Sequence, residues 1–514
     1  MAPLIPVILI GLAGAVARFW QLGAKSFWLD EAVTYDVAAR PLAALIRTAA
    51  GYDAHPPLFS VLAHPFILLV GNETGLRFLP ALCSLLLMVA VYAAARRAEK
   101  DPARPQNSPP SPFVFWTVLL CSLSAFQVFF AQEGRLYTLF GLLALALFLL
   151  VQRFLEPENR KDGKLLAAAA AVSAAGIYTH LYFFFVIAAS VVAVAAAADA
   201  PRKKRRWALS QAAALVLFVP WIPALVARAG LATPAGPVTG FSLFFAFNQL
   251  SIGYTVVDLP TVLLSSFFCV LPVAAVIAAL FAGRSSRLSA LLAPPPETEQ
   301  RQFLLPLAIF LLLPLCAVVL MPLRVQEFEA KHLFFLSPFF LLLSAYGLGR
   351  IKKQAAAVFI GAGILFFNVF SLATYFSPEF RKENWRQAAA YVKTRAQTGD
   401  ALIFSPDYAA FPFVRYEGSG IPVITGGPAG LDLGPAVAAG TRRIWLVENF
   451  SPVAEPDARI AALLSSRGAA GETILFTGAL GMIQIRPYTL SPRKREAVEG
   501  RRLMEKPYPH TEIP

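Results

Sequence analysis

The stretch from Phe303 to Leu320, FLLPLAIFLLLPLCAVVL, contains no charged side chain. A helix needs about 20 mostly apolar residues to cross a lipid bilayer, and comparable stretches recur along the chain. The 514 residues are 57% hydrophobic and only 15% charged, whereas soluble domains have about 25% charged residues. The composition therefore indicates a multi-pass membrane protein.

Apolar stretches of sufficient length predict about eleven transmembrane helices. The first lacks a basic n-region and a convincing cleavage site, so we expect a retained span rather than a removed signal peptide. The four cysteines all lie in apolar runs outside any C-x-x-C pattern, which argues against disulfides and thiolate metal sites. The predicted spans are 3–22, 76–95, 113–131, 136–153, 165–180, 182–198, 207–228, 261–283, 303–322, 332–349 and 354–375.

The net charge of +14 is distributed in a way that indicates how the protein is oriented in the membrane, and it does not indicate nucleic-acid binding. Lys and Arg concentrate in alternate loops, for example in the run Arg202–Arg206, and such loops are cytoplasmic by the positive-inside rule. The opposite, Lys- and Arg-poor side then carries the long loop 23–75 and everything after residue 376. For a bacterial inner (plasma) membrane, this side is the periplasm or the exterior.

After residue 376 the pattern changes to short apolar strands and amphipathic helices, which is typical of a soluble α/β domain of about 110 residues. We predict helices at 384–396 and 456–466. The expected fold class is thus an all-α polytopic membrane domain (1–375, with outer loop 23–75), a small soluble extracytoplasmic α/β domain (376–490) and a basic, disordered tail (491–514). The predicted strands are 401–404, 422–425, 444–447, 473–476 and 482–486.

Two adjacent carboxylates, Asp30 and Glu31, follow the first span directly, between aromatic residues. Charged groups at a membrane boundary often mark substrate or ion paths. The alternative is that both acids only stabilise the N-terminus of a surface helix.

Four further polar clusters lie at the outer ends of predicted spans, and each also has an ordinary structural explanation. His55 precedes two prolines, which suit a rigid turn. Glu133 and Arg135 stand in a hairpin with Tyr137 and either pair with each other or contribute a guanidinium for phosphate. The other two clusters are Tyr178-Thr179-His180, where a packed neutral histidine is the alternative, and Lys331-His332, where a headgroup anchor is the alternative. All five clusters fall on one predicted face, which favours a shared site.

These motifs together resemble the family 39-type, integral-membrane C-fold (GT-C) glycosyltransferases, which are related to protein O-mannosyltransferases and lipid A aminoarabinose transferases. The resemblance covers roughly residues 1–375 and extends more loosely into the domain behind them. The motifs that carry it are Asp30-Glu31, His55-Pro56-Pro57-Leu58, Gln132-Glu133-Gly134-Arg135-Leu136-Tyr137, Thr179-His180 and Asn384-Trp385-Arg386.

The resemblance implies a sugar donor carried on a polyprenyl phosphate, with Asp30 as the catalytic carboxylate and Glu31 as its acidic partner. Arg135 matches an arginine of the second motif. Where relatives often have Arg-Tyr, this chain has Lys331-His332, which keeps a cation but loses bidentate contact with phosphate. We expect Asp30 to act as general base and Arg135 and Lys331 to bind the donor phosphate. Additional substrate-site candidates are His55, Glu133, Tyr137, His180 and His332.

The expected reaction is an inverting transfer of a hexosyl or pentosyl group to an extracytoplasmic lipid, glycan or protein acceptor. No Asp-x-Asp motif stands out, so we expect no obligatory metal or other cofactor, with a divalent cation near Asp30, Glu31 and His55 left open. The expected partners are this donor, its acceptor and membrane lipids, and no nucleic acid.

Two other classes of protein compete with this interpretation. A transporter or flippase of lipid-linked saccharides would show repeat symmetry and charges at mid-membrane, whereas the charges here lie at helix ends. A non-catalytic envelope assembly protein would use the C-terminal domain for recognition, and Asp30→Asn would then have no effect.

Overall fold

The chain divides into two compact units that alternate along the sequence. The computed structural model describes residues 5–51, 55–99, 110–156, 162–228, 238–282, 291–293, 295, 300–320, 328–418, 420–424, 433, 440–450 and 456–491. The first unit comprises residues 1–22 and 37–376, and the second comprises 23–36 and 377–514. The predicted division placed all of 23–75 with the membrane domain, so segment 23–36 is grouped differently.

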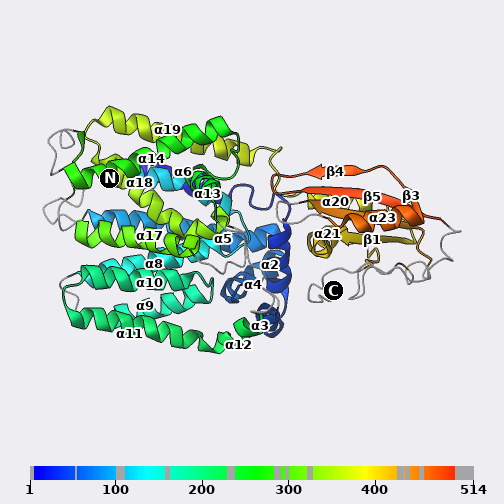
Figure 1. The fold of residues 1–514 in the computed structure, drawn as a ribbon, viewed down its shortest axis with the longest axis horizontal. Coiled ribbons are helices and arrows are strands. Elements are labelled where there is room, and N and C mark those ends of the chain that lie inside the picture. The colour runs from blue at the N-terminus through cyan, green and yellow to red at the C-terminus, as the bar shows by residue number, and fades with distance from the viewer. Residues whose placement is uncertain are drawn as a thin grey trace. The chain divides into compact units, whose positions relative to one another are not determined.

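The first unit is built from helices, and α8, α9, α10 and α11 lie side by side within it (Figure 1). Three helices, α2 (Leu29–Ala39), α3 and α4, occupy the long loop after the first span, and α2 begins within the second unit. Besides α2, the helices described for the first unit are α1 (Ile5–Phe19), α3 (Leu42–Gly51), α4 (Leu58–Val70), α5 (Glu73–Ala98), α6 (Pro112–Leu123), α7 (Ala125–Ala131), α8 (Tyr137–Leu155), α9 (Asp162–Ile177), α10 (Phe183–Ala197), α11 (Pro201–Phe218), the 3₁₀-helix η2 (Val219–Trp221), α12 (Ile222–Arg228), α13 (Gly240–Ile252), α14 (Leu259–Ala282), the π-helix η4 (Gln300–Leu304), α17 (Leu305–Leu320), the 3₁₀-helix η5 (Ala330–Leu336), α18 (Ser337–Arg350) and α19 (Gln354–Phe376).

In the described residues, every predicted span coincides with a helix or with consecutive helical segments. Within the described residues, seven helices are long and apolar enough to cross a membrane, or eight if the bent pair α6 and α7 forms one span. The helices α1, α9 and α10 have 15, 16 and 15 residues, which is short for a bilayer about 30 Å thick. The total of about eleven spans therefore remains a prediction.

The bend of 48° between α6 and α7 exposes backbone carbonyls that no helical N–H can satisfy. Arg18, fully buried on α1, supplies the missing donors. Its guanidinium donates to the carbonyls of Cys121 (3.0 Å) and Ser122 (3.3 Å), to the Gly14 carbonyl (2.8 Å) and to the Ser84 hydroxyl (2.9 Å). Unpaired backbone groups are costly in lipid, so Arg18 stabilises the broken span that leads to Glu133 and Arg135.

Replacing Arg18 by Met is expected to destabilise the protein by about 2–4 kcal/mol, because buried carbonyls lose their partners. Thermal unfolding in detergent measures the effect. Val16→Ala is the control, since Val16 is on the same helix and 60% exposed. Equal unfolding midpoints for the two variants would show that Arg18 does not support the bend.

The second unit contains a five-stranded mixed sheet with the order β1-β2-β5-β3 and with β4 also paired to β5 (Figure 1). β1 and β2 are parallel, and the other pairs are antiparallel. Both faces are covered, since alternate residues of β1 enter two apolar clusters, with Leu402 in one and Ile403 in the other. The elements are β1 (Asp400–Ser405), β2 (Arg443–Phe450), β3 (Gly468–Ala470), β4 (Ile474–Thr477), β5 (Met482–Leu490), α20 (Trp385–Lys393), α21 (Ala410–Glu417) and α23 (Ala458–Arg467).

Most predicted elements of this unit are present in the described residues. The predicted strand 422–425 contributes only a single parallel bridge, from Val423 to Leu402, and residue 425 lies outside the described residues. The sequence analysis missed β3 and α21, which are short. The predicted tail beyond Ser491 also lies outside the described residues.

Candidate active site

Asp30 and Glu31 lie in the first turn of α2, as a helix-capping role also requires. Their burial exceeds what such a role needs, because Glu31 is fully buried and Asp30 is partly buried. The Glu31 carboxylate forms an ion pair with the ammonium of Lys382, also fully buried, at 4.0 Å. An uncompensated buried charge is strongly unfavourable, so Lys382 accounts for the stability of Glu31 in this position.

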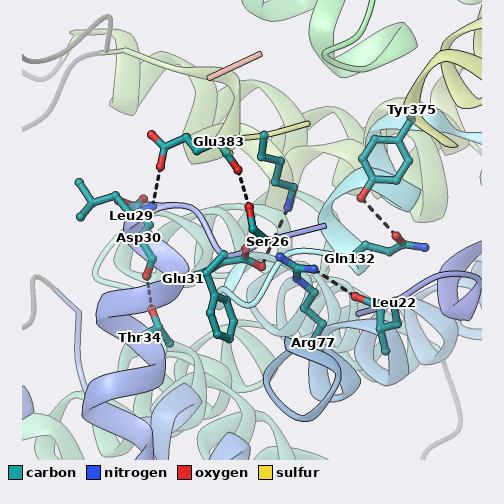
Figure 2. A network of polar contacts seen from close by, with 12 residues as sticks. Leu22, Ser26, Leu29, Asp30, Glu31, Thr34, Arg77, Gln132, Tyr375 and Glu383 are labelled. Carbon is teal, nitrogen blue, oxygen red and sulfur yellow. Dashed lines mark hydrogen bonds and ion pairs between the residues drawn. The ribbon is translucent and has the colours of Figure 1, made fainter. Parts of the chain in front are cut away.

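Glu383 holds the segment that enters α2 (Figure 2). Its side-chain Oε2 accepts the backbone N–H of Leu29 at 3.1 Å and the indole N–H of Trp385. Its backbone carbonyl accepts the Ser26 hydroxyl. The first N–H groups of a helix have no intrahelical partner, so Glu383 acts as a capping residue for α2 from a distant part of the chain.

The helix α21 fixes the aromatic residues of the same segment. The hydroxyl of Tyr416 accepts the Phe27 N–H at 2.7 Å. The Arg415 guanidinium lies over the ring of Tyr35, 3.5 Å from its centroid, and over the ring of Phe27, at 5.4 Å. Cation–π contacts of this kind add to the hydrogen bonds that hold residues 26–35 in one conformation.

Burial raises the pKa of Glu383 to about 7, and the nearby negative charge of Asp30 also raises it. Hydrogen bonds from Trp385, Leu29 and Asn449 oppose this shift. A carboxyl group that titrates near neutral pH beside the candidate catalytic carboxylate is the kind of perturbed group that occurs at functional sites.

In the first unit, the structure brings His55 and His180 together, with ring centroids 4.9 Å apart. The backbone links their segments, because the Leu58 N–H donates to the Tyr178 carbonyl at 3.1 Å. The ring of His180 also stacks on Phe140 at 5.0 Å. The proline turn after His55 therefore packs against the turn between α9 and α10.

Burial and the positive charge of Arg135 lower the pKa of His180 to about 3. Its Nδ1 lies 3.0 Å from the Tyr182 backbone N–H and accepts this hydrogen, which leaves Nε2 to carry the proton of the neutral ring. His180 is thus a neutral hydrogen-bond donor near Arg135.

Tyr254 lies at the centre of a second group of polar residues in this unit. Its ring stacks on Phe129 at 4.9 Å, and its hydroxyl is buried close to the backbone of Lys331. Burial and the charges of Glu329 and Glu133 raise its pKa well above 10. The phenol therefore stays protonated and can donate a hydrogen bond to a bound ligand.

Lys331 forms an ion pair with Glu329, with 2.8 Å between Nζ and Oε1. His332 is buried, and its ring lies 6.5 Å from that of Tyr182.

The structure thus distributes the predicted site residues over both units. Asp30 and Glu31 belong to the second, and the other candidates belong to the first. Sequence reasoning missed Lys382, Glu383 and Tyr254. The adjacent Asn384-Trp385-Arg386 motif was a signal for the first two, whereas Tyr254 stands in a loop without a recognisable pattern.

Gln132 supports the hairpin that carries Glu133 and Arg135. Its amide donates to the carbonyls of Ala17 (3.0 Å) and Trp20 (2.8 Å), and its Oε1 accepts the Tyr375 hydroxyl at 3.2 Å (Figure 2). The hairpin is therefore tied to the ends of α1 and α19.

Among the described residues, no group of three or more His, Cys, Asp or Glu side chains is arranged to hold a metal ion.

The sequence matches no protein-family model and no curated protein. Solved structures nevertheless share its fold. ArnT from Cupriavidus metallidurans matches in the apo state with a TM-score of 0.58 and 14% identity over 94% of this chain and 98% of ArnT. The same protein bound to undecaprenyl phosphate matches with a TM-score of 0.55 and equal coverage.

A second structure of this kind is the archaeal oligosaccharyltransferase AglB from Archaeoglobus fulgidus, in complex with an inhibitory peptide and a dolichol-phosphate. It matches with a TM-score of 0.51 and 9% identity over 88% of this chain and 74% of AglB. Identities this low establish the fold alone. The chain is an integral membrane protein with the GT-C fold of ArnT and AglB, as its sequence motifs implied.

Proposed function

We propose that this protein transfers a sugar from a polyprenyl-phosphate donor to an extracytoplasmic acceptor. The observation that carries the proposal is the shared fold over 94% of the chain, combined with Asp30 at the start of the first helix after span one. ArnT has been solved with undecaprenyl phosphate and AglB with a dolichol-phosphate. Both ligands are lipid phosphates of the kind that the proposed donor would release as its leaving group.

In the proposed reaction, Asp30 removes the proton from the acceptor hydroxyl as its oxygen attacks the anomeric carbon. The bond from this carbon to the phosphate oxygen breaks, and the polyprenyl phosphate leaves. A single displacement inverts the anomeric configuration. Glu31, held by Lys382 at 4.0 Å, fixes the backbone beside Asp30.

The leaving phosphate requires positive charge and hydrogen-bond donors. Arg135 is the principal cation in this proposal, because a guanidinium can contact a phosphate through two hydrogen bonds. Lys331 is the second cation. The rings of His55 and His180 and the phenols of Tyr137 and Tyr254 would contact uncharged parts of the donor. The divalent cation remains open and is tested by chelator treatment.

The proposed location is the inner membrane of a bacterium, with the reacting groups on the periplasmic or outer side. The loops rich in Lys and Arg would then be cytoplasmic. This orientation supplies the donor from the bilayer and the acceptor from the aqueous side.

An assay in sealed proteoliposomes separates transfer from transport. Donors labelled in the sugar are placed in the leaflet opposite the acceptor or in the same leaflet. When the donor lies in the same leaflet as the acceptor, a transferase yields labelled acceptor and polyprenyl phosphate. These two products are the expected result. Movement of intact donor between leaflets without cleavage would instead establish a flippase and overturn the proposal.

A further inference from the structure

Residues Arg381 to Glu383 connect the sheet of the second unit to the turn that carries Asp30. The hairpin between β4 and β5 holds them by main-chain hydrogen bonds. The N–H of Ala479 donates to the Arg381 carbonyl at 2.7 Å, and that of Leu480 donates to the Lys382 carbonyl at 2.9 Å. Because these bonds are main chain to main chain, the position of Glu383 follows that of the sheet.

Gly478 makes this close approach possible. A Cβ atom at this position would lie 2.4 Å from the Lys382 carbonyl oxygen and 2.9 Å from the Glu383 Cα. These atoms are backbone and cannot move aside like a flexible side chain. The hairpin and residues 382–383 therefore form one tightly packed element.

Residues 382 and 383 also contact α2, at the positions directly before and after Asp30. Glu383 accepts the N–H of Leu29, and Lys382 pairs with Glu31. The main chain of Asp30 is thus fixed between two restrained neighbours. Hydrogen bonds to an ionised carboxylate are shorter and stronger than neutral ones, and a negative charge at a helix N-terminus is favourable.

Resting on the proposed function, we propose that Glu383 is a positioning residue for Asp30. Its ionised carboxylate caps α2 and holds Asp30 in the orientation that proton removal requires, with the β4–β5 hairpin as its support. The C-terminal sheet then has a part in the chemical step beyond any role in acceptor choice.

The ionisation of Glu383 responds to the charges around it. Asp30 and Glu31 on α2 are negative, Lys382 next to it in sequence is positive, and Asn449 on β2 is neutral. With a pKa of about 7, Glu383 is ionised above neutral pH and becomes protonated below it. Activity should therefore decline as the pH falls through about 7, when the cap on α2 weakens.

Steady-state kinetics of Glu383→Gln tests this role in the full-length protein. Misplacement of a catalytic group by about 1 Å costs on the order of 100-fold in rate. We expect kcat at pH 8 to fall by about tenfold to 100-fold, while the KM for the donor changes by less than about threefold. The decline of native kcat near pH 7 should be absent from the variant, and Glu383→Asp should recover part of the rate.

Glu472→Gln is the matched control, because Glu472 is an exposed glutamate of the same unit. It should keep the native rate and pH profile. A Glu383→Gln enzyme with native kcat and the same decline near pH 7 would overturn the proposal. So would an equal loss in both variants.

Hydrogen–deuterium exchange provides a readout that does not need turnover. Faster exchange at residues 26–34 in Glu383→Gln than in Glu472→Gln would support the positioning role even if no donor is consumed. Unchanged exchange there would overturn it. Failure of the native protein to process any donor would count against the proposed function alone.

The pH dependence of stability gives a further check with a defined sign. Glu383 has a higher pKa in the folded protein than its ordinary value of 4.5, so the folded state binds the proton more tightly. Its contribution to stability is complete below about pH 4.5 and is lost as the pH rises through about 7. The unfolding midpoint of Glu383→Gln should therefore rise relative to the native midpoint between pH 5 and pH 8. A constant difference would contradict the assignment.

Discussion

Asp30→Asn is expected to lower kcat for sugar transfer by about 10²–10⁴-fold, the usual contribution of a general base. An amide cannot accept the proton of the acceptor hydroxyl, although it preserves the size and shape of the side chain. Donor binding should remain within a few-fold of the native value, because the carboxylate acts in the chemical step. Turnover of a labelled donor and equilibrium binding of the same donor measure the two effects separately.

Asp36→Asn is the control for this substitution, since Asp36 is a partly buried carboxylate on the same helix. We expect it to retain most of the native activity. If Asp30→Asn is as active as Asp36→Asn, the general base is another group, and the envelope assembly interpretation gains support.

Arg135→Met is expected to lower kcat/KM for the donor by about 10²–10³-fold, because the leaving phosphate loses its principal cation. Arg135→Lys should recover only part of this loss, since an ammonium cannot make the bidentate contact of a guanidinium. Rates measured over a range of donor concentrations separate a loss of binding from a loss of turnover.

Lys331→Met provides the comparison, with a smaller expected effect. The ammonium of Lys331 is a point charge and cannot make the bidentate contact with phosphate that a guanidinium makes. A larger loss for Lys331→Met than for Arg135→Met would reverse the two roles and contradict the proposed phosphate site.

Hydropathy predicted the membrane helices because each span must be apolar along its whole length. Even the break between α6 and α7 lies inside the predicted span 113–131. The break itself was not predicted. Its sequence, Ser122 to Ser124, is unremarkable, and the partners that stabilise it, Arg18 and Asn368, lie more than 100 residues away.

The candidate site was only partly predictable for the same reason. Motifs identified Asp30, Glu31 and Arg135, whose chemistry is local to short patterns. Glu383 was not predicted because its role depends on a hydrogen bond to Leu29, which is 354 positions away in the sequence. The sequence around Trp385 does not indicate that a neighbouring charged residue contacts the N-terminus of a helix at the other end of the chain.

The grouping of segment 23–36 with the C-terminal unit changes how a deletion should be interpreted. If the C-terminal domain selects the acceptor, removal of residues after 376 should impair acceptor use and leave donor binding intact. Such a deletion also removes Lys382 and Glu383, and with them the partners of Glu31 and Leu29. Point substitutions on the sheet surface are therefore the better test of acceptor selection.

The central claim is transfer from a polyprenyl-phosphate sugar, and turnover by the purified protein tests it most directly. The measurement uses a panel of radiolabelled polyprenyl-phosphate sugars, native protein in detergent and Asp30→Asn as the control. We predict that the native chain consumes one donor and releases polyprenyl phosphate, while Asp30→Asn does not. Neither turnover nor Arg135-dependent binding of any donor by the native chain would contradict the claim.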